Sequence, residues 1–308
     1  MNKNLAMIIG AGAALVLGAH LALSATPNVD SAIATVPEAK SSPKAAKPTA
    51  HIVFEKKNTV SLRVPFTQSF VDDLKAQLIA TSNALPAGEP IYLYLSTPGG
   101  SITAGESLID TIAGLPNPVY TVVNFAASMG FMTTESVKGT RYILPSGTLM
   151  AHRAFMGIEG QVPGQFDERA RFNEEDIRDI ETNVAARIGL NHAQYAEKIK
   201  NEYWVTGERA VEAGAADQVA TATCSSDLTG TYTQTLETFF GPVAIEWANC
   251  PLINSPVSVH LASGSLLFNE TDLQNADKLV SSIRTALEDP RNMIDNVTLQ
   301  NAFTSNAK

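Results

Sequence analysis

The sequence is poor in cysteine and in positive charge, and each shortage excludes a class of protein. Its two cysteines, Cys224 and Cys250, are too few for a zinc cluster or for a small fold built on disulfides. Lysine and arginine together number 22 against 31 aspartate and glutamate residues, which leaves a formal net charge of −9 at pH 7. An acidic chain lacks the positive field that attracts nucleic acid, so we expect no DNA or RNA partner.

Apolar residues are plentiful, at 44% of 308 residues. That is enough for a sizeable core in one large domain or two ordinary ones, and it excludes wholesale disorder. Between residues 51 and 222, strand-like and helix-like stretches alternate. For example, the apolar run Ile91–Leu95 is followed by the breaker Thr97–Gly100 and then by a helical pattern over Thr103–Leu115. Such repeats predict an α/β domain with a largely parallel sheet.

Two local features of this domain carry specific expectations. Short strands are predicted on either side of Pro145-Ser146-Gly147, over Arg141–Leu144 and Thr148–Met150. Phe166–Leu190 is predicted to be one long amphipathic helix, since apolar residues recur at helical spacing among many charges. Its polar face is either a solvated surface or a surface that packs against another subunit.

The first 25 residues have the pattern of a secretory signal. Lys3 precedes an uncharged apolar run over Leu5–Ala25, and small residues end it. The run also reaches the roughly 20 residues that a bilayer span needs, so an uncleaved membrane anchor through residues 5–25 is the alternative, and a buried helix is a third. Residues 26–50 are rich in Ala, Pro, Ser, Thr and Lys and predict a disordered linker. We therefore expect an exported protein, periplasmic or secreted, or one anchored to the inner membrane.

Export changes the interpretation of the two cysteines. Outside the cytoplasm a bridge between Cys224 and Cys250 would persist and would close a loop of about 25 residues. Two buried thiols are the alternative.

Three short motifs carry candidate chemistry. Ser128 lies where an apolar strand gives way to a helix, so its hydroxyl is near backbone N–H groups that can stabilise an oxyanion. Taken alone, a serine there is usually a helix cap. The Gly99-Gly100 pair is either a simple turn or a close approach of the backbone to a ligand. His152 ends a predicted strand and is either structural or a general base.

Together these motifs resemble a known family. Residues Ile91–Gly105 (IYLYLSTPGGSITAG), Ala126–Gly130 (AASMG), Lys138–Pro145 (KGTRYILP), Met150–His152 and Ala210–Gly214 (AVEAG) follow the order and spacing of the proteolytic subunit of the Clp protease. His152 lies 24 residues after Ser128. The resemblance covers about His51 to Ala222.

The resemblance implies a ClpP/crotonase-like fold of repeated β-β-α units and a serine peptidase that needs no metal or organic cofactor. By position, Ser128 would be the nucleophile and His152 the base. The backbone N–H groups of Gly100 and Met129 would form the oxyanion hole. The long helix over Phe166–Leu190 would be the protruding handle through which two rings stack.

The sequence departs from the family at the third triad position. The family has an Asp two residues before an aromatic, and the matching position here is Glu202, two residues before Trp204 and 50 after His152. A Glu can orient an imidazole, although its extra methylene moves the carboxylate by about 1.5 Å unless the backbone compensates. Asn201 is a fallback, and a plain surface glutamate is the alternative to a catalytic one.

The sequence thus predicts an exported serine endopeptidase in a homo-oligomeric ring that takes peptides or unfolded proteins. Its relatives receive chains from a ring ATPase, but ATP is not expected outside the cytoplasm, so we expect a ring without that partner. One alternative is a membrane-associated Ser-Lys peptidase of the signal-peptide peptidase A or NfeD-linked type, with Lys138 as base. Another is a catalytically silent scaffold subunit. Residues 223–308 form a C-terminal extension of unknown role, with strands expected over Thr229–Trp247 and a helix over Asp272–Leu287.

Overall fold

The computed structural model describes residues 50–263 and 270–294. The predicted leader and nearly all of the predicted linker therefore lie outside the described residues. Within the described ranges, no helix combines the length and the apolar character needed to cross a membrane.

The main sheet has seven strands, and it is mostly parallel. Its order is β1-β7-β5-β4-β3-β2, and the seventh strand, β6, pairs antiparallel with β5. The inner strand β3 is buried on both faces, which explains its nearly unbroken apolar run. This arrangement confirms the predicted α/β class. The strands are β1 (Ala50–Phe54), β2 (Thr59–Leu62), β3 (Ile91–Thr97), β4 (Val119–Ala127), β5 (Arg141–Ala151), β6 (Tyr203–Thr206) and β7 (Gln218–Cys224).

The prediction of two short strands around Pro145 was wrong, because β5 runs unbroken from Arg141 to Ala151. The ladder to β4 shifts register between Val123 and Phe125, so the residues around Pro145 fall in an irregular stretch. A proline is tolerated there because the bulge does not require its missing N–H.

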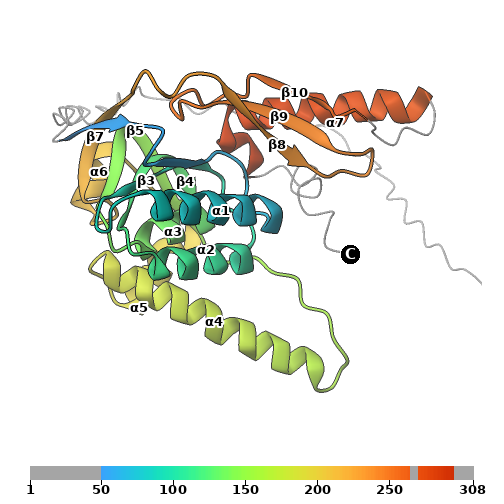
Figure 1. Ribbon diagram of the computed structural model, residues 1–308. Coiled ribbons are helices and arrows are strands. Elements are labelled where there is room, and N and C mark those ends of the chain that lie inside the picture. The colour runs from blue at the N-terminus through green and yellow to red at the C-terminus, as the bar shows by residue number, and fades with distance from the viewer. Residues whose placement is uncertain (1–49, 264–269, 295–308) are drawn as a thin grey trace, which may run out of the picture. The chain divides into compact units, whose positions relative to one another are not determined.

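Helices α1, α2 and α3 lie together against the main sheet (Figure 1), and their apolar side chains join its largest hydrophobic cluster. The long predicted helix is present as α4, but only Glu181, Val184 and Ala185 are buried along it. Its first half exposes apolar side chains, with Phe172 at 65%. The helices of this part are α1 (Gln68–Ala84), α2 (Ile102–Gly114), α3 (Met129–Ser136), α4 (Gln165–Arg187), α5 (His192–Lys198), the 3₁₀ turn η1 (Ile199–Asn201) and α6 (Gly207–Glu212).

A second, smaller cluster is built from aromatic residues of β1 and β3. Phe54 of β1 packs edge to face on Tyr94 of β3, with ring centroids 5.8 Å apart, although the two strands are not neighbours in the sheet. The β1–β7 pair therefore folds back over β3. Leu228 and Leu252, from the segments after β7 and β9, pack against this cluster.

The C-terminal extension forms a three-stranded antiparallel sheet and a helix. Strands over Thr229–Trp247 and a helix over Asp272–Leu287 were predicted, whereas the third strand, over Ser258–Leu261, was not. Its buried residues Trp247 and Ile283 belong to the same hydrophobic cluster as Leu62 of β2. The structure joins Cys224, at the end of β7, to Cys250 in a disulfide. The extension is thus packed and cross-linked onto the main sheet. Its elements are β8 (Thr231–Leu236), β9 (Val243–Ala248), β10 (Ser258–Leu261), α7 (Glu270–Glu288) and the 3₁₀ turn η2 (Pro290–Met293).

Candidate active site

The predicted site residues gather at one edge of the main sheet. Because β3, β4 and β5 are parallel, their carboxyl ends meet at the same edge. Gly99 follows β3, Ser128 follows β4 and His152 follows β5. Strand β6 is antiparallel to β5, so it begins at this edge, and Glu202 directly precedes it.

Ser128 adopts a strained backbone conformation at the sharp turn from β4 into α3. Its φ is 54° and its ψ is −118°, a region that few residues other than glycine occupy. Its N–H donates to the Met150 carbonyl oxygen of β5 at 2.8 Å. Ser128 stands at the N-cap position of α3, yet its side chain makes no capping hydrogen bond. The hydroxyl is therefore not used as a helix cap, and the strain presents it beside the start of α3.

The glycine turn after β3 packs directly against Ser128. A Cβ at Gly99, whose φ is +90°, would lie 2.7 Å from the Ser128 Cβ and 2.8 Å from the Met129 nitrogen. The Phe66 N–H donates to the Gly99 carbonyl at 2.8 Å, and the Ser101 N–H donates to the Phe66 carbonyl at 2.8 Å. In this bridge the N–H of the intervening Gly100 is directed away from Phe66. Only glycine fits at position 99.

Two backbone N–H groups are available for an oxyanion near Ser128. The Met129 N–H is the first of α3, so it has no partner within the helix. The Gly100 N–H takes no part in the bridge to Phe66. Both groups come from the turns that carry Gly99 and Ser128, so they are candidates for an oxyanion hole.

His152 is half-buried, and its environment favours the neutral imidazole. Burial lowers its pKa below the usual value of 6.5, and the Glu202 carboxylate opposes this by raising it. No hydrogen bond joins His152 to the Ser128 hydroxyl within the described part of the chain. Catalytic hydrogen bonds are often long before substrate binds, so the two groups remain compatible with a nucleophile and its base.

Glu202 lies within electrostatic reach of His152. The β5–β6 ladder pairs Met150 with Trp204 and Ala151 with Tyr203, so its next step would bring His152 opposite Glu202. Glu202 has a φ of 63°, which turns the chain from η1 into β6. Its Oε2 accepts a hydrogen bond from the Trp204 indole N–H at 2.8 Å. The sequence argument did not identify Trp204 as a functional partner, because the contact depends on the turned backbone at Glu202.

The two alternative candidates from the sequence, Asn201 and Lys138, are less well placed for catalysis. Asn201 is exposed in η1 and precedes Glu202. Lys138 precedes β5, whereas His152 follows it, so the length of an 11-residue strand separates them. That length is roughly 30 Å. Lys138 therefore lies at the opposite edge of the sheet from Ser128.

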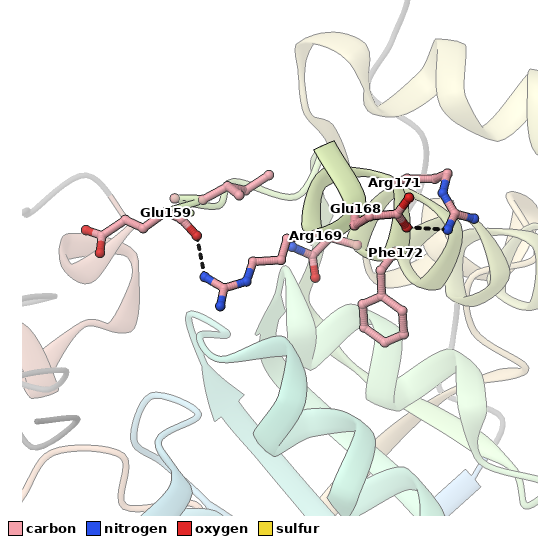
Figure 2. A pocket seen from close by; sticks show the side chains of 8 residues that line it. Glu159, Glu168, Arg169, Arg171 and Phe172 are labelled. Atoms are coloured by element: carbon pink, nitrogen blue, oxygen red, sulfur yellow. Dashed lines mark hydrogen bonds and ion pairs between the residues drawn. The ribbon is translucent and has the colours of Figure 1, made fainter. Parts of the chain in front are cut away.

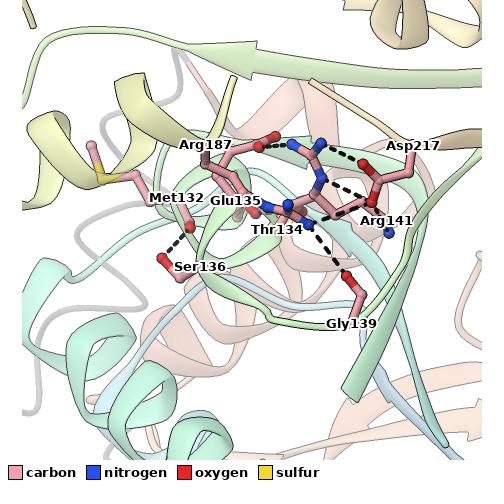
Figure 3. Close-up of polar contacts among 9 residues, drawn as sticks. Met132, Thr134, Glu135, Ser136, Gly139, Arg141, Arg187 and Asp217 are labelled. Carbon is pink, nitrogen blue, oxygen red and sulfur yellow. Dashed lines mark hydrogen bonds and ion pairs between the residues drawn. The ribbon is translucent and has the colours of Figure 1, made fainter. Parts of the chain in front are cut away.

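A buried ion cluster at that opposite edge was also missed in the sequence. The guanidinium of Arg141, at the start of β5, binds the Glu135 carboxylate at the end of α3 and the Asp217 carboxylate before β7 (Figure 3), the latter at 2.6 Å. Burial raises the pKa of Glu135, and the Arg141 guanidinium opposes the rise. The cluster ties the end of the helix that follows Ser128 to two strands. Only the tertiary structure reveals it, because its members are up to 82 residues apart in sequence.

A surface hollow lies away from these residues, along the first turns of α4. Arg169 reaches across it and donates to the Glu159 carbonyl, and Arg171 forms an ion pair with Glu168 at 2.6 Å (Figure 2). None of the candidate catalytic residues lines it. Its lining residues are Gly157, Ile158, Glu159, Glu168, Arg169, Arg171, Phe172 and Asn173.

Comparison with known proteins decides the family. The Clp protease family model matches residues 45–223. The chain belongs to the Clp protease family. It is a ClpP-like serine peptidase, as the motifs around Ser128 and His152 predicted.

Three relatives carry the name ATP-dependent Clp protease proteolytic subunit 2. The protein from Cutibacterium acnes is 34% identical over 163 residues, which cover 51% of this chain and 76% of the relative. The protein from Tropheryma whipplei is 31% identical over 165 residues, covering 52% and 91% respectively. That from Thermobifida fusca is 34% identical over 178 residues, covering 54% and 84%. The similarity thus spans most of each relative and leaves the remainder of this chain unmatched.

Proposed function

We propose that this Clp-family serine endopeptidase acts through a Ser128–His152–Glu202 triad. The observation that carries the proposal is the convergence of these residues, with Gly99 and Gly100, at one edge of the sheet. The absence of a capping hydrogen bond at Ser128 and the electrostatic influence of Glu202 on His152 support it.

The mechanism follows from these roles. His152 accepts the Ser128 hydroxyl proton as the oxygen attacks the peptide carbonyl carbon. The Gly100 and Met129 N–H groups stabilise the negative oxygen of the tetrahedral intermediate. His152 then protonates the leaving amine, and an acyl-enzyme remains on Ser128. Water, deprotonated by His152, hydrolyses the acyl-enzyme and regenerates the hydroxyl.

Glu202 would hold the imidazole in position and stabilise its cation. It is suited to this role because its carboxylate already favours the protonated form of His152. We propose that the turned backbone at Glu202, with a φ of 63°, offsets the extra length of the glutamate side chain.

Labelling with a fluorophosphonate probe tests the nucleophile. We expect the wild type to be labelled and Ser128→Ala to remain unlabelled. Ser136 lies at the far end of α3, so the control Ser136→Ala should be labelled as the wild type is. Wild-type protein that hydrolyses no peptide and takes up no probe would favour the alternative of a silent scaffold subunit. Labelling that survives Ser128→Ala would overturn the assignment of the nucleophile.

We propose further that the chain assembles into a ring in which α4 serves as the handle. Apolar side chains exposed on α4 and on the segment before it support this, with Phe155 exposed by 94% and Phe172 by 65%. Exposed apolar groups of this kind mark protein–protein contacts. Native mass measurement should give an oligomer for the wild type and smaller species for Phe155→Ser/Phe172→Ser. A monomeric wild type would contradict the ring.

We also propose that the protein is exported and acts without an ATPase on short or unfolded peptides. The apolar run over residues 5–25 and the Cys224–Cys250 disulfide support export, since disulfides persist in oxidising compartments. The relatives are named as ATP-dependent proteins. Fusion of residues 1–50 to a reporter that is active only after export should give activity. Co-purification of the full chain with a ring ATPase would overturn the unpartnered state.

A further inference from the structure

The indole of Trp204 contacts the carboxylate that we assign to the triad. Its Nε1–H donates to Glu202 Oε2 at 2.8 Å. Glu202 directly precedes β6 and Trp204 is the second residue of that strand, so the hydrogen bond joins the turn before β6 to the strand itself. One carboxylate oxygen is thereby held, and the other remains for the imidazole.

Trp204 is itself held by the strands that lead to the other two triad residues. It pairs with Met150 on β5, two residues before His152. Its ring packs on Phe125 of β4, three residues before Ser128, with centroids 6.4 Å apart. Phe125, Ala127 and Met150 form one small buried cluster. The indole, although 42% exposed, therefore contacts the strand that leads to the nucleophile and lies on the strand paired with the one that leads to the base.

A glutamate at this position needs such support. Its side chain is exposed and has one more rotatable bond than an aspartate, so fixing it costs more conformational entropy. A hydrogen bond from a rigid ring offsets part of that cost by restricting where the carboxylate can lie.

We propose that Trp204 is a positioning residue that aims the Glu202 carboxylate at His152. This inference rests on the proposed function of Ser128, His152 and Glu202. Without the indole N–H the carboxylate turns toward solvent, and the imidazole loses both its orientation and its countercharge.

A double-mutant cycle tests the proposal. Trp204→Phe keeps an aromatic ring on Phe125 and removes only the donor, while Glu202→Gln removes the charge. Tyr203→Phe is the matched control, because its side chain points to the opposite face of β6. Each variant is assayed for peptide hydrolysis and for the rate of fluorophosphonate labelling across pH.

We expect Trp204→Phe to lower kcat by about 10-fold, the scale of a small misplacement of a catalytic group. Glu202→Gln should lower it by on the order of 10³-fold. In both variants the acidic limb of the labelling rate should move to lower pH, because the carboxylate that raises the pKa of His152 is lost or displaced. The double variant should be no slower than Glu202→Gln alone, and Tyr203→Phe should match the wild type.

Multiplicative losses in the double variant, or an acidic limb that stays in place in Trp204→Phe, would show that Trp204 only supports the fold and would overturn the proposal. Failure of the proposed function gives a different result. In that case the wild type itself is not labelled, or labelling persists in Ser128→Ala. Circular dichroism of each variant identifies any loss of fold, and if Trp204→Phe unfolds, the same cycle with Trp204→Leu, which also lacks a donor, replaces it.

Discussion

The Ser128 N–H donates to the Met150 carbonyl oxygen at 2.8 Å, which ties the turn carrying the candidate nucleophile to the strand that ends at the candidate base. The bond spans β4 and β5 one step beyond their ladder, where Ala127 pairs with Met150. It fixes the backbone of Ser128 in its positive-φ conformation. The backbone thus sets the direction in which the Ser128 side chain leaves the turn before any substrate binds.

The strained backbone at Ser128 predicts that replacing this residue with glycine raises the stability of the protein while abolishing activity. Ser128→Gly and Ser128→Ala should both be inactive, but only glycine adopts a φ of 54° without strain. We expect Ser128→Gly to be more stable than Ser128→Ala by about 1 kcal/mol. Urea unfolding at equal protein concentration measures the difference. An alanine variant as stable as the glycine variant would mean that the turn carries no strain.

Gly99→Ala should damage the site far more than a comparable change elsewhere. The new Cβ would lie 2.5 Å from the Ala127 carbonyl oxygen and 2.7 Å from the Ser128 Cβ. We expect kcat/KM to fall by about 100-fold or more, since the nucleophile must shift. Gly88→Ala is the matched control, because Gly88 has a similar φ of +87° but no neighbour within 4 Å. Equal activity of the two variants would contradict the close packing of Gly99 on Ser128.

Asp217→Asn should lower the free energy of unfolding at neutral pH, and this difference from the wild type should shrink in acid. Burial acts to raise the pKa of Asp217, but hydrogen bonds from Arg141 outweigh it and hold the pKa below the usual 3.8. The stabilisation is therefore complete above about pH 4 and is lost as the pH falls through the lowered pKa.

We expect Asp217→Asn to lower the free energy of unfolding by about 2 kcal/mol at pH 7, less than for a fully buried pair because the Asp217 side chain is 34% exposed. Asp72→Asn, which removes an exposed ion pair with Lys75, is the control and should change little. Unfolding measured from pH 7 to pH 3 checks both. A gap between wild type and Asp217→Asn that does not narrow as the pH falls from 7 to 3 would contradict the linkage.

Removing the disulfide should destabilise the junction between the main sheet and the extension. Cys224 and Cys250 are 26 positions apart, and a crosslink closing such a loop contributes about 3 kcal/mol. We expect Cys224→Ser/Cys250→Ser to unfold at correspondingly lower urea. Reductant should bring the wild type to the same midpoint and leave the double variant unchanged. If the thiols of the reduced wild type become titratable but its urea midpoint does not fall, the disulfide does not stabilise the protein.

Arg63→Lys should loosen the extension, although it conserves charge. The Arg63 guanidinium lies over the Trp247 ring at 4.8 Å and donates to the Ala248 carbonyl at 2.7 Å and the Ile253 carbonyl at 2.9 Å. A lysine ammonium cannot reproduce this planar fork. We expect a loss of about 2 kcal/mol and faster limited proteolysis within residues 225–294. Arg284 lies on the exposed face of α7, so the control Arg284→Lys should behave as the wild type does. Equal proteolysis of the two variants would contradict the role of Arg63 in holding the extension.

Local sequence patterns were reliable where local physics decides the structure. The apolar run at Ile91 became β3, the pattern after Thr103 became α2, and the amphipathic stretch after Phe166 became α4. The error at Pro145 has a non-local cause. A proline ordinarily ends a strand, but β5 continues because its ladder to β4 shifts register at that point.

The sequence by itself determined the family, the α/β class and the identities of Ser128, His152 and Glu202 as candidates, because short motifs and hydrophobic periodicity are properties of neighbouring residues. The tertiary structure alone decided which strand ends meet. In the folded chain the Trp204 indole donates to Glu202, and Gly99 packs on Ser128. Lys138 lies at the opposite edge of the sheet, where Arg141 binds Glu135 and Asp217. Those contacts depend on strand order and register, which pair residues distant along the chain and leave no mark on any one segment.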